Sequence, residues 1–307
     1  MRKWIFVKST VFFLVPISLL FLSGLFLPPT PRASTSLLFA NVKKDSLLQH
    51  SEGPRIIFVG GSNLSFGLNS QTIRDSLGLY PINTGVNAAV GLKYMLENTL
   101  QYVKEGDKII LSIEYELFYK HYDQTSDVLL RTIVDVFPEK WKDLSLSQKF
   151  RLIPYLPRFS LTKLNPTEYV AYSENQMYGG NTFNEYGDAV SHWNLNGWDF
   201  RPANIGGQFN MNVIHKMKEF ESAVNQKEGE VLITFPGLDE VTFQKNRHAV
   251  LQVERNLKQT DFTILGSSER YVFPGEMMFD THYHLIKEGV DVRTKRLIYD
   301  YLQTIEY

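Results

Sequence analysis

The chain has 307 residues, of which 43% are hydrophobic and 21% are charged, and this ordinary globular composition excludes an intrinsically disordered protein. A formal net charge of -1 removes any bulk electrostatic attraction to nucleic acid, so we expect no nucleic-acid partner. The chain has no cysteine, which excludes disulfides, thiolate metal sites and cysteine nucleophiles.

The N-terminus reads as a membrane anchor. Basic residues within the first eight positions precede an uncharged stretch, residues 9–31, whose apolar part Val11–Leu27 is long enough to cross a bilayer. Basic residues in front of the span predict a cytoplasmic N-terminus and an extracytoplasmic body, on the periplasmic or cell-surface side. We interpret residues 1–31 as an uncleaved signal-anchor, since no small-x-small cleavage site follows; a cleaved signal peptide is the alternative.

The body of the chain alternates apolar strands with helical patterns, which predicts an α/β fold with a doubly wound parallel sheet covered on both faces. Short apolar runs predict strands at Arg55–Gly61, Tyr80–Gly85, Lys108–Ile113, Glu230–Phe235 and Phe262–Leu265. Helices are expected from a cap at Ser70 to Gly78, over about 90–103, and at 211–224, 240–257 and 287–302.

The domain organisation follows from this alternation. Residues 32–54 form a linker, and residues 55–307 form the main domain. A long insert at about 119–208, rich in Tyr, Trp, Asn and Gly and without clear periodicity, interrupts the strands and helices. Segments of this length in compact domains are usually lids, binding loops or small subdomains, so we expect the insert to cover the active end of the sheet.

Three segments at the ends of predicted strands carry candidate chemistry, because active groups of an open parallel sheet gather there. In the first, Ser62 follows Gly60-Gly61 at a tight turn that lets the backbone approach a substrate closely. A serine that only caps a helix would look the same. In the second, Asn83–Ala89 forms a turn into a helix, and its free N–H groups suit an anion or oxyanion.

The third segment, near the C-terminus, reads Asp280-Thr281-His282-Tyr283-His284. A serine nucleophile needs a base and the base needs an acid to orient it, and Asp280 with His284 supplies both. We choose His284 over His282, which is too close to Asp280 in the chain to be held by it and still reach a serine. Asp280, His282 and His284 could instead hold a divalent metal, or the two histidines could be structural.

Together the three segments resemble the blocks of the SGNH/GDSL hydrolase superfamily. The resemblance covers residue 55 to the C-terminus without the insert. It implies a flavodoxin-like sheet order and acyl-ester chemistry that uses neither metal nor cofactor. It also implies Ser62, Asp280 and His284 as catalytic residues, with oxyanion or substrate contacts among Gly85, Asn87 and Ala88.

The sequence departs from the family's pattern at three places. The histidine comes one residue later than usual, and Ala88 stands where the second block has a glycine. The third block has Glu114 and Glu116 instead of an asparagine that donates to the oxyanion, and an ionised glutamate cannot donate. Either Asn63, Asn87 or Tyr115 supplies the donor, or a glutamate stays protonated, or the oxyanion hole is weaker. An inactive homologue is therefore an alternative.

The anchor makes the layout similar to membrane-tethered SGNH members of alginate O-acetylation and D-alanine transfer. That resemblance implies a serine-dependent O-acyl esterase or O-acyltransferase, with acetyl as the expected group. The substrate would be an extracytoplasmic glycan or acylated polymer, and the partner a membrane-bound O-acyltransferase. Trp193 and Trp198 of the insert would stack on sugar rings, and we expect one or the other to lie near Ser62. The alternative is a catalytically silent SGNH-like binding subunit of a polysaccharide modification or export complex.

Overall fold

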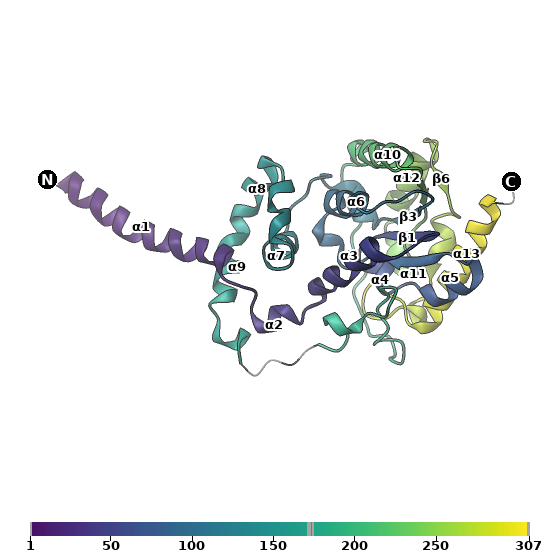
Figure 1. The fold of residues 1–307 in the computed structure, drawn as a ribbon, viewed down its shortest axis with the longest axis horizontal. Coiled ribbons are helices and arrows are strands. Elements are labelled where there is room, and N and C mark those ends of the chain that lie inside the picture. Colours follow the sequence, from purple (N-terminus) through teal and green to yellow (C-terminus); the bar gives the residue numbers. More distant parts are fainter. Residues whose placement is uncertain (1, 171–172, 174, 306–307) are drawn as a thin grey trace.

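A computed structural model describes residues 2–170, 173 and 175–305 (Figure 1). Five strands form one sheet in the order β2-β1-β3-β4-β6, and every pair is parallel. The predicted α/β fold with a parallel sheet is therefore confirmed. The strands are β1 (Arg55–Gly60), β2 (Tyr80–Asn83), β3 (Lys108–Ser112), β4 (Glu230–Ile233) and β6 (Thr263–Ile264).

Both faces of the sheet are buried, because alternate residues of each strand point to opposite sides. On β1, Ile57 and Val59 belong to the main hydrophobic core, whereas Ile56 and Phe58 belong to a second core on the other face. Figure 1 shows α6, α10 and α12 over one face, with α5 and α13 over the other. The near-continuous apolar strands follow from this double burial.

The helices that follow residue 55 match the predicted ones with small shifts, whereas α3 lies in residues 32–54, the segment predicted to be a linker. Their bounds are α3 (Ala40–His50), α5 (Ser70–Leu77), α6 (Leu92–Leu100), α10 (Met211–Asn225), α11 (Glu240–Lys245), α12 (Arg247–Lys258) and α13 (Lys287–Ile305). The cap of α5 is Asn69, whose side chain accepts from Thr72, so Ser70 as the cap was wrong. The predicted helix 240–257 is broken at Asn246, whose amide side chain is hydrogen-bonded to the carbonyls of Ala203 and Thr242.

Shorter elements connect these helices and strands. Two short strands, β5 (Leu238–Asp239) and β7 (Val272–Phe273), pair in parallel as a separate two-stranded sheet. The remaining short helices outside the insert are α2 (Pro31–Ser34), η1 (Leu37–Phe39), α4 (Ser62–Ser65), η2 (Ala88–Val90), η3 (Tyr115–Tyr119), η9 (Glu269–Tyr271) and η10 (Gly275–Met277).

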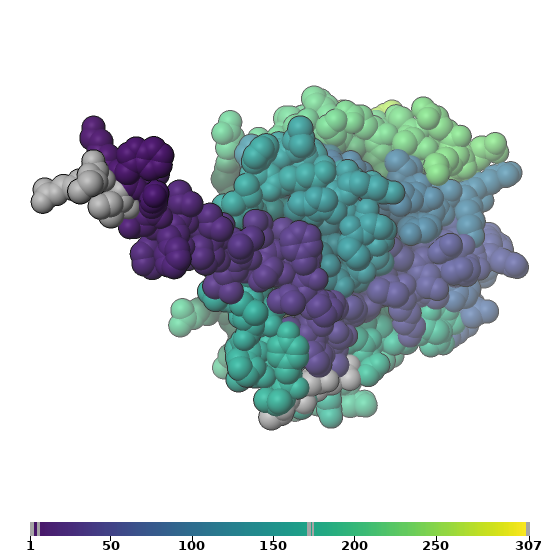
Figure 2. Space-filling view, turned by 60° about the vertical axis from the view of Figure 1, so that its left-hand side comes forward, coloured from purple at the N-terminus to yellow at the C-terminus, as the bar shows by residue number. Residues whose placement is uncertain are grey.

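The N-terminal helix α1 (Arg2–Phe26) projects from the body (Figure 1). It is long and apolar enough to span a membrane, as predicted, and most of its apolar side chains are exposed. Its last turns contact the body through α9 (Leu156–Lys163), where the Ser160 hydroxyl donates to the Phe21 carbonyl and Lys163 donates to the Leu27 carbonyl at 2.6 Å. Figure 2 shows α1 leaving the body beside the teal surface to which α9 belongs.

The insert is more regular than its sequence indicates. Its first half folds into short helices around a separate apolar core formed by Leu129, Leu152, Phe159 and their neighbours. The elements are α7 (Asp127–Arg131), η4 (Thr132–Val136), η5 (Pro138–Asp143), α8 (Leu146–Leu152), η6 (Ile153–Tyr155), α9, η7 (Pro166–Glu168) and η8 (Gly180–Thr182). The absence of periodicity was misleading because each helix is only one or two turns long.

Candidate active site

Ser62 lies at the carboxyl end of β1, in the turn that opens α4. The turn is tightly enclosed: a Cβ atom on Gly61 would overlap a carboxylate oxygen of Glu114 and lie 2.6 Å from the backbone N of Ala88. Strand β1 has β2 on one side and β3 on the other, so this turn lies where the strand order reverses. In open parallel sheets that reversal is the usual ligand-binding crevice.

Asp280 and His284 are brought into direct contact. Oδ1 of Asp280 lies 2.8 Å from Nδ1 of His284, and the other carboxylate oxygen accepts a hydrogen bond from the Tyr178 hydroxyl. Burial would raise the pKa of Asp280, but the hydrogen bonds from His284 and Tyr178 outweigh it and hold that pKa below its usual range. Burial lowers the pKa of His284 despite the carboxylate, so the ring is neutral and able to accept a proton at neutral pH.

Phe66 connects Ser62 to this pair. Its ring stacks on the His284 ring with centroids 4.3 Å apart and planes 16° from parallel. The Phe66 N–H donates to the Ser62 carbonyl at 2.9 Å, so the two residues are one helical turn apart and share a face. Ser62 and His284 therefore belong to the same end of the sheet. Among the described residues, no hydrogen bond joins the Ser62 hydroxyl to the His284 ring.

His282 points to a different partner. Its Nε2 lies 3.2 Å from Glu116, which also accepts a hydrogen bond from the Tyr283 hydroxyl at 2.7 Å. Burial raises the pKa of Glu116, but these two hydrogen bonds more than offset it and leave the pKa below the usual value. Within the described part of the chain, no three His, Asp or Glu side chains are arranged to hold a metal ion, and Asp280, His282 and His284 form no such cluster.

The Glu114 carboxylate accepts hydrogen bonds from the backbone amides of the residues on either side of Ser62. This carboxylate, only 3% exposed, accepts the backbone N–H of Gly61 at 3.1 Å and that of Asn63 at 3.3 Å. Burial raises the pKa of Glu114 although these hydrogen bonds oppose the rise. The two amides cannot serve an oxyanion while Glu114 holds them, and a protonated Glu114 would itself become a donor.

Two of the predicted oxyanion donors, Asn63 and Tyr115, are not available to an oxyanion. The Asn63 side chain donates to the Ser112 carbonyl at 2.9 Å and accepts from Arg293 at 2.8 Å, which fixes the turn to β3 and α13. Burial lowers the pKa of Arg293 to about 10, so it keeps its charge at neutral pH. The Tyr115 hydroxyl lies buried in the main apolar core with no partner among the described residues.

The second block offers better donors at Asn87 and Ala88. The amide of Gly85 donates to the Asn83 side chain at 3.1 Å, so it is engaged. Asn87 uses its side-chain oxygen to cap η2 through Ala89 at 2.9 Å and leaves its NH₂ group without a partner in the described structure. The backbone N of Ala88 is close to Gly61, beside the serine. Neither the Asn87 NH₂ group nor the Ala88 N–H has a hydrogen-bond partner among the described residues, so both are candidate oxyanion donors.

Comparison with family models, with curated proteins and with solved structures finds no match to this chain. The chemistry of this end of the sheet is therefore inferred from its own side chains. Asp280 and His284 form an oriented acid–base pair, and Ser62 lies one helical turn from the ring that stacks on His284. This arrangement has the parts needed for nucleophilic catalysis.

The two insert tryptophans contact residues that flank the histidine segment. The Trp198 ring lies 5.7 Å from the Phe279 ring and is 56% exposed. The Lys287 ammonium lies 4.7 Å from the centre of the Trp193 ring, and Trp193 packs against the main core. The insert thus reaches the surroundings of the Asp280–His284 segment, but no hydrogen bond or ring contact in the described structure joins either tryptophan to Ser62.

Sequence reasoning missed Tyr178 and Phe66, which complete the surroundings of His284. Tyr178 is 102 positions from Asp280 in the chain, within the part of the insert that lacks periodicity. Its hydroxyl also lies 3.4 Å from Nδ1 of His284. No local pattern marks such a partner. Phe66 carried a weak signal, because it follows Ser62 by the four residues that place side chains on one helical face.

Proposed function

We propose that this protein is a serine-dependent O-acyl esterase or O-acyltransferase of the SGNH/GDSL type. The observation that carries the proposal is the Asp280–His284 pair at 2.8 Å, on the same end of a parallel sheet as Ser62. The sheet order supports it as well: with its five strands counted along the chain, it is 2-1-3-4-5, the flavodoxin-like order.

In the proposed reaction, the Ser62 oxygen attacks the acyl carbonyl while Nε2 of His284 takes the hydroxyl proton. Asp280 holds the Nδ1 proton and stabilises the imidazolium that forms, and Tyr178 fixes the second oxygen of Asp280. The Ala88 N–H and the Asn87 NH₂ group stabilise the oxyanion. His284 then returns the proton to the leaving alcohol. Water or an acceptor hydroxyl releases the acyl group from Ser62 in a second round.

The proposed substrate is an acylated polysaccharide outside the cytoplasm, with acetyl as the group transferred. The support is the apolar helix α1, whose first turns carry basic residues that favour a cytoplasmic N-terminus. Its contact with α9 supports an anchor that stays attached to the folded body. The layout also resembles membrane-tethered proteins of polymer acylation, so a membrane-bound O-acyltransferase is the proposed partner.

Glu114 favours a second candidate, a catalytically silent subunit that binds the polymer. Its carboxylate already occupies two amides beside Ser62, and an ionised carboxylate would repel an oxyanion at that place. In a silent subunit, the Asp280–His284 pair would be retained for structure alone, held between Phe66 and Tyr178.

Turnover by matched variants tests the proposal. The purified full chain is assayed for hydrolysis of an activated aryl acetate and for acetyl transfer to an oligosaccharide. Ser62→Ala and His284→Ala should each abolish turnover, and the double variant should lose no more, because both residues act in one step. His282→Ala is the control and should keep most activity. If the wild type is inactive in both assays, the silent-subunit candidate is supported. If His282→Ala is inactive and His284→Ala is active, His282 is the base and the assignment of His284 is wrong.

A further inference from the structure

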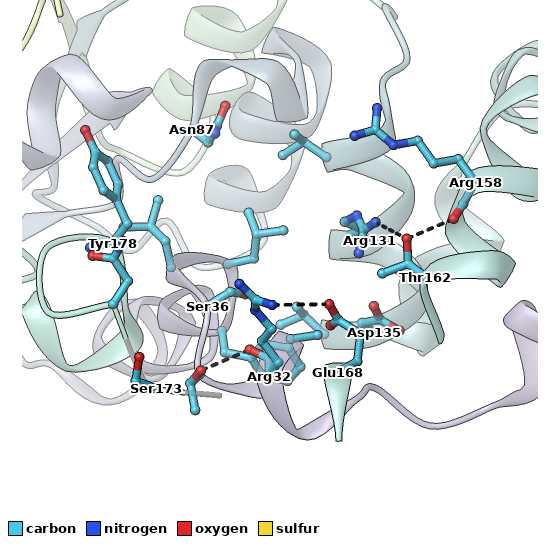
Figure 3. A pocket seen from close by; sticks show the side chains of 18 residues that line it. Arg32, Ser36, Asn87, Arg131, Asp135, Arg158, Thr162, Glu168, Ser173 and Tyr178 are labelled. Carbon is cyan, nitrogen blue, oxygen red and sulfur yellow. Dashed lines mark hydrogen bonds and ion pairs between the residues drawn. The ribbon is translucent and has the colours of Figure 1, made fainter. Parts of the chain in front are cut away.

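A cavity of about 680 Å³ lies between the insert helices and the linker, close to the point where α1 leaves the body. Figure 3 shows Arg131 and Arg158 on one side of it, Tyr178 on the other, and Arg32 between them at the lower edge. Arg32 comes from α2, Arg131 from α7 and Arg158 from α9. The lining also contains hydroxyl and amide groups, those of Thr35, Ser36, Ser173 and Asn175.

The three arginines form only long ion pairs, or none, with carboxylates of the described residues. Arg32 lies 3.9 Å from Glu168, and Arg131 lies 3.8 Å from Asp127. Arg158 is exposed and has no carboxylate within 4.0 Å in the part of the chain that the structure describes. The other acid in the lining, Asp135, is already neutralised by the buried Lys163 at 2.6 Å. The cavity lining therefore carries an excess of positive charge that can attract an anion.

The cavity lies close to the apolar helix α1. Helix α9, which carries Arg158, is the helix that contacts the last turns of α1. The neighbouring surface is unusually apolar for a soluble domain, because large hydrophobic side chains of α8, η6 and α9 are exposed: Leu146, Phe150, Ile153 and Leu161. A surface of this kind beside a spanning helix belongs at the level of the lipid headgroups.

From these observations we propose that the cavity binds a phosphate-bearing anion, with Arg158 and Arg131 as its principal ligands. Guanidinium groups present forked donors that match phosphate oxygens, and three of them from separate elements can surround one group. Two sources share this chemistry: the headgroup of an anionic lipid, and a soluble phosphate ester. Tyr178 and Asn87 of the proposed catalytic site also line the cavity, whereas Ser62, Asp280 and His284 do not, so the arginine side can be tested separately from acyl transfer.

Binding to the full chain in nonionic detergent tests the proposal. The probes are dioctanoyl phosphatidylglycerol, dioctanoylglycerol as its phosphate-free match, and glycerol phosphate as the soluble source. Dissociation constants come from the rise of the unfolding midpoint with ligand concentration. Arg158→Ala and Arg131→Ala should each weaken binding of a phosphate probe by about tenfold or more, since each removes a charged hydrogen-bonding group. Dioctanoylglycerol should not bind at this site.

The control is Arg247→Ala, which removes an exposed arginine from α12, away from the cavity (Figure 1). It should bind as the wild type does, and Ser62→Ala should as well, which separates this site from the catalytic proposal. Binding of the lipid alone identifies a headgroup site, and binding of both phosphate probes identifies a site that soluble phosphate esters also reach. No binding of either, or equal binding by wild type, Arg158→Ala and Arg131→Ala, overturns the proposal.

Discussion

His192 should make the folded state sensitive to acid. Its ring is fully buried between Phe66 and Phe279, with centroids 5.0 Å from each. Its Nε2 lies 3.0 Å from the Leu285 carbonyl and therefore carries the proton, while Nδ1 is buried with no partner among the described residues. Protonation at Nδ1 would place an unpaired charge in an apolar site, close to His284.

The size of the effect follows from the pKa. Burial lowers the pKa of His192 to about 4 from an ordinary 6.5, against the opposing effect of the Leu285 carbonyl. Because the folded pKa is the lower one, the stabilising contribution is complete above pH 6.5 and is lost as the pH falls toward 4. At pH 4 the unfolded chain binds the proton and the folded chain binds it only in part, so the loss is about 3 kcal/mol.

The matched variant is His192→Gln, which can keep a donor for the Leu285 carbonyl but does not titrate. Urea unfolding of both full chains in nonionic detergent, at pH 7.5 and at pH 4.0, gives the free energy of unfolding. The wild type should lose about 3 kcal/mol more than the variant between these two pH values. Parallel losses in the two proteins would refute the reasoning, because other titrating groups are common to both.

Three further predictions concern Tyr178, Gly61 and Arg55. Tyr178→Phe should lower turnover about tenfold or more with little change in KM, because Asp280 loses a charged hydrogen bond; an unchanged kcat would show that Tyr178 does not orient the acid. Gly61→Ala should destabilise the fold by about 1–3 kcal/mol in urea unfolding, whereas Gly275→Ala, where a Cβ meets nothing, should be near neutral; equal effects would contradict the close packing of the serine turn. Arg55→Met should lower the free energy of unfolding by about 3–5 kcal/mol, because it leaves the buried carboxylate of Asp107 unpaired. A loss below about 1 kcal/mol, the size typical of solvent-exposed ion pairs, would contradict this.

The sheet was predictable because its strands are buried on both faces. The middle of β3, Ile109–Leu111, is wholly apolar, and such a run between turn signals has few other interpretations. The contact between Asp280 and His284 was also within reach, since the two residues are four positions apart. The cap of α5 was misplaced by one residue because Asn69 and Ser70 are both good capping residues, and the sequence alone does not rank them.

The rest of the site depends on contacts that no local pattern contains. That an ionised Glu114 cannot donate to an oxyanion was predictable, but its role as acceptor for the amides of Gly61 and Asn63 follows only from the pairing of β1 with β3. Tyr178 reaches Asp280 from an insert whose helices are too short to show a period. The arginines of the cavity come from three separate elements, so only the folded chain brings them to one place.

The most direct test of the central claim is covalent labelling of Ser62 by a fluorophosphonate, located by peptide mass spectrometry on the full chain. Only a serine activated by a neighbouring base reacts quickly with such a probe. The proposed function predicts a single major adduct on the peptide that contains Ser62, lost in Ser62→Ala and strongly reduced in His284→Ala. Absence of the adduct from the folded wild type, or equal labelling of wild type and His284→Ala, would contradict an activated serine.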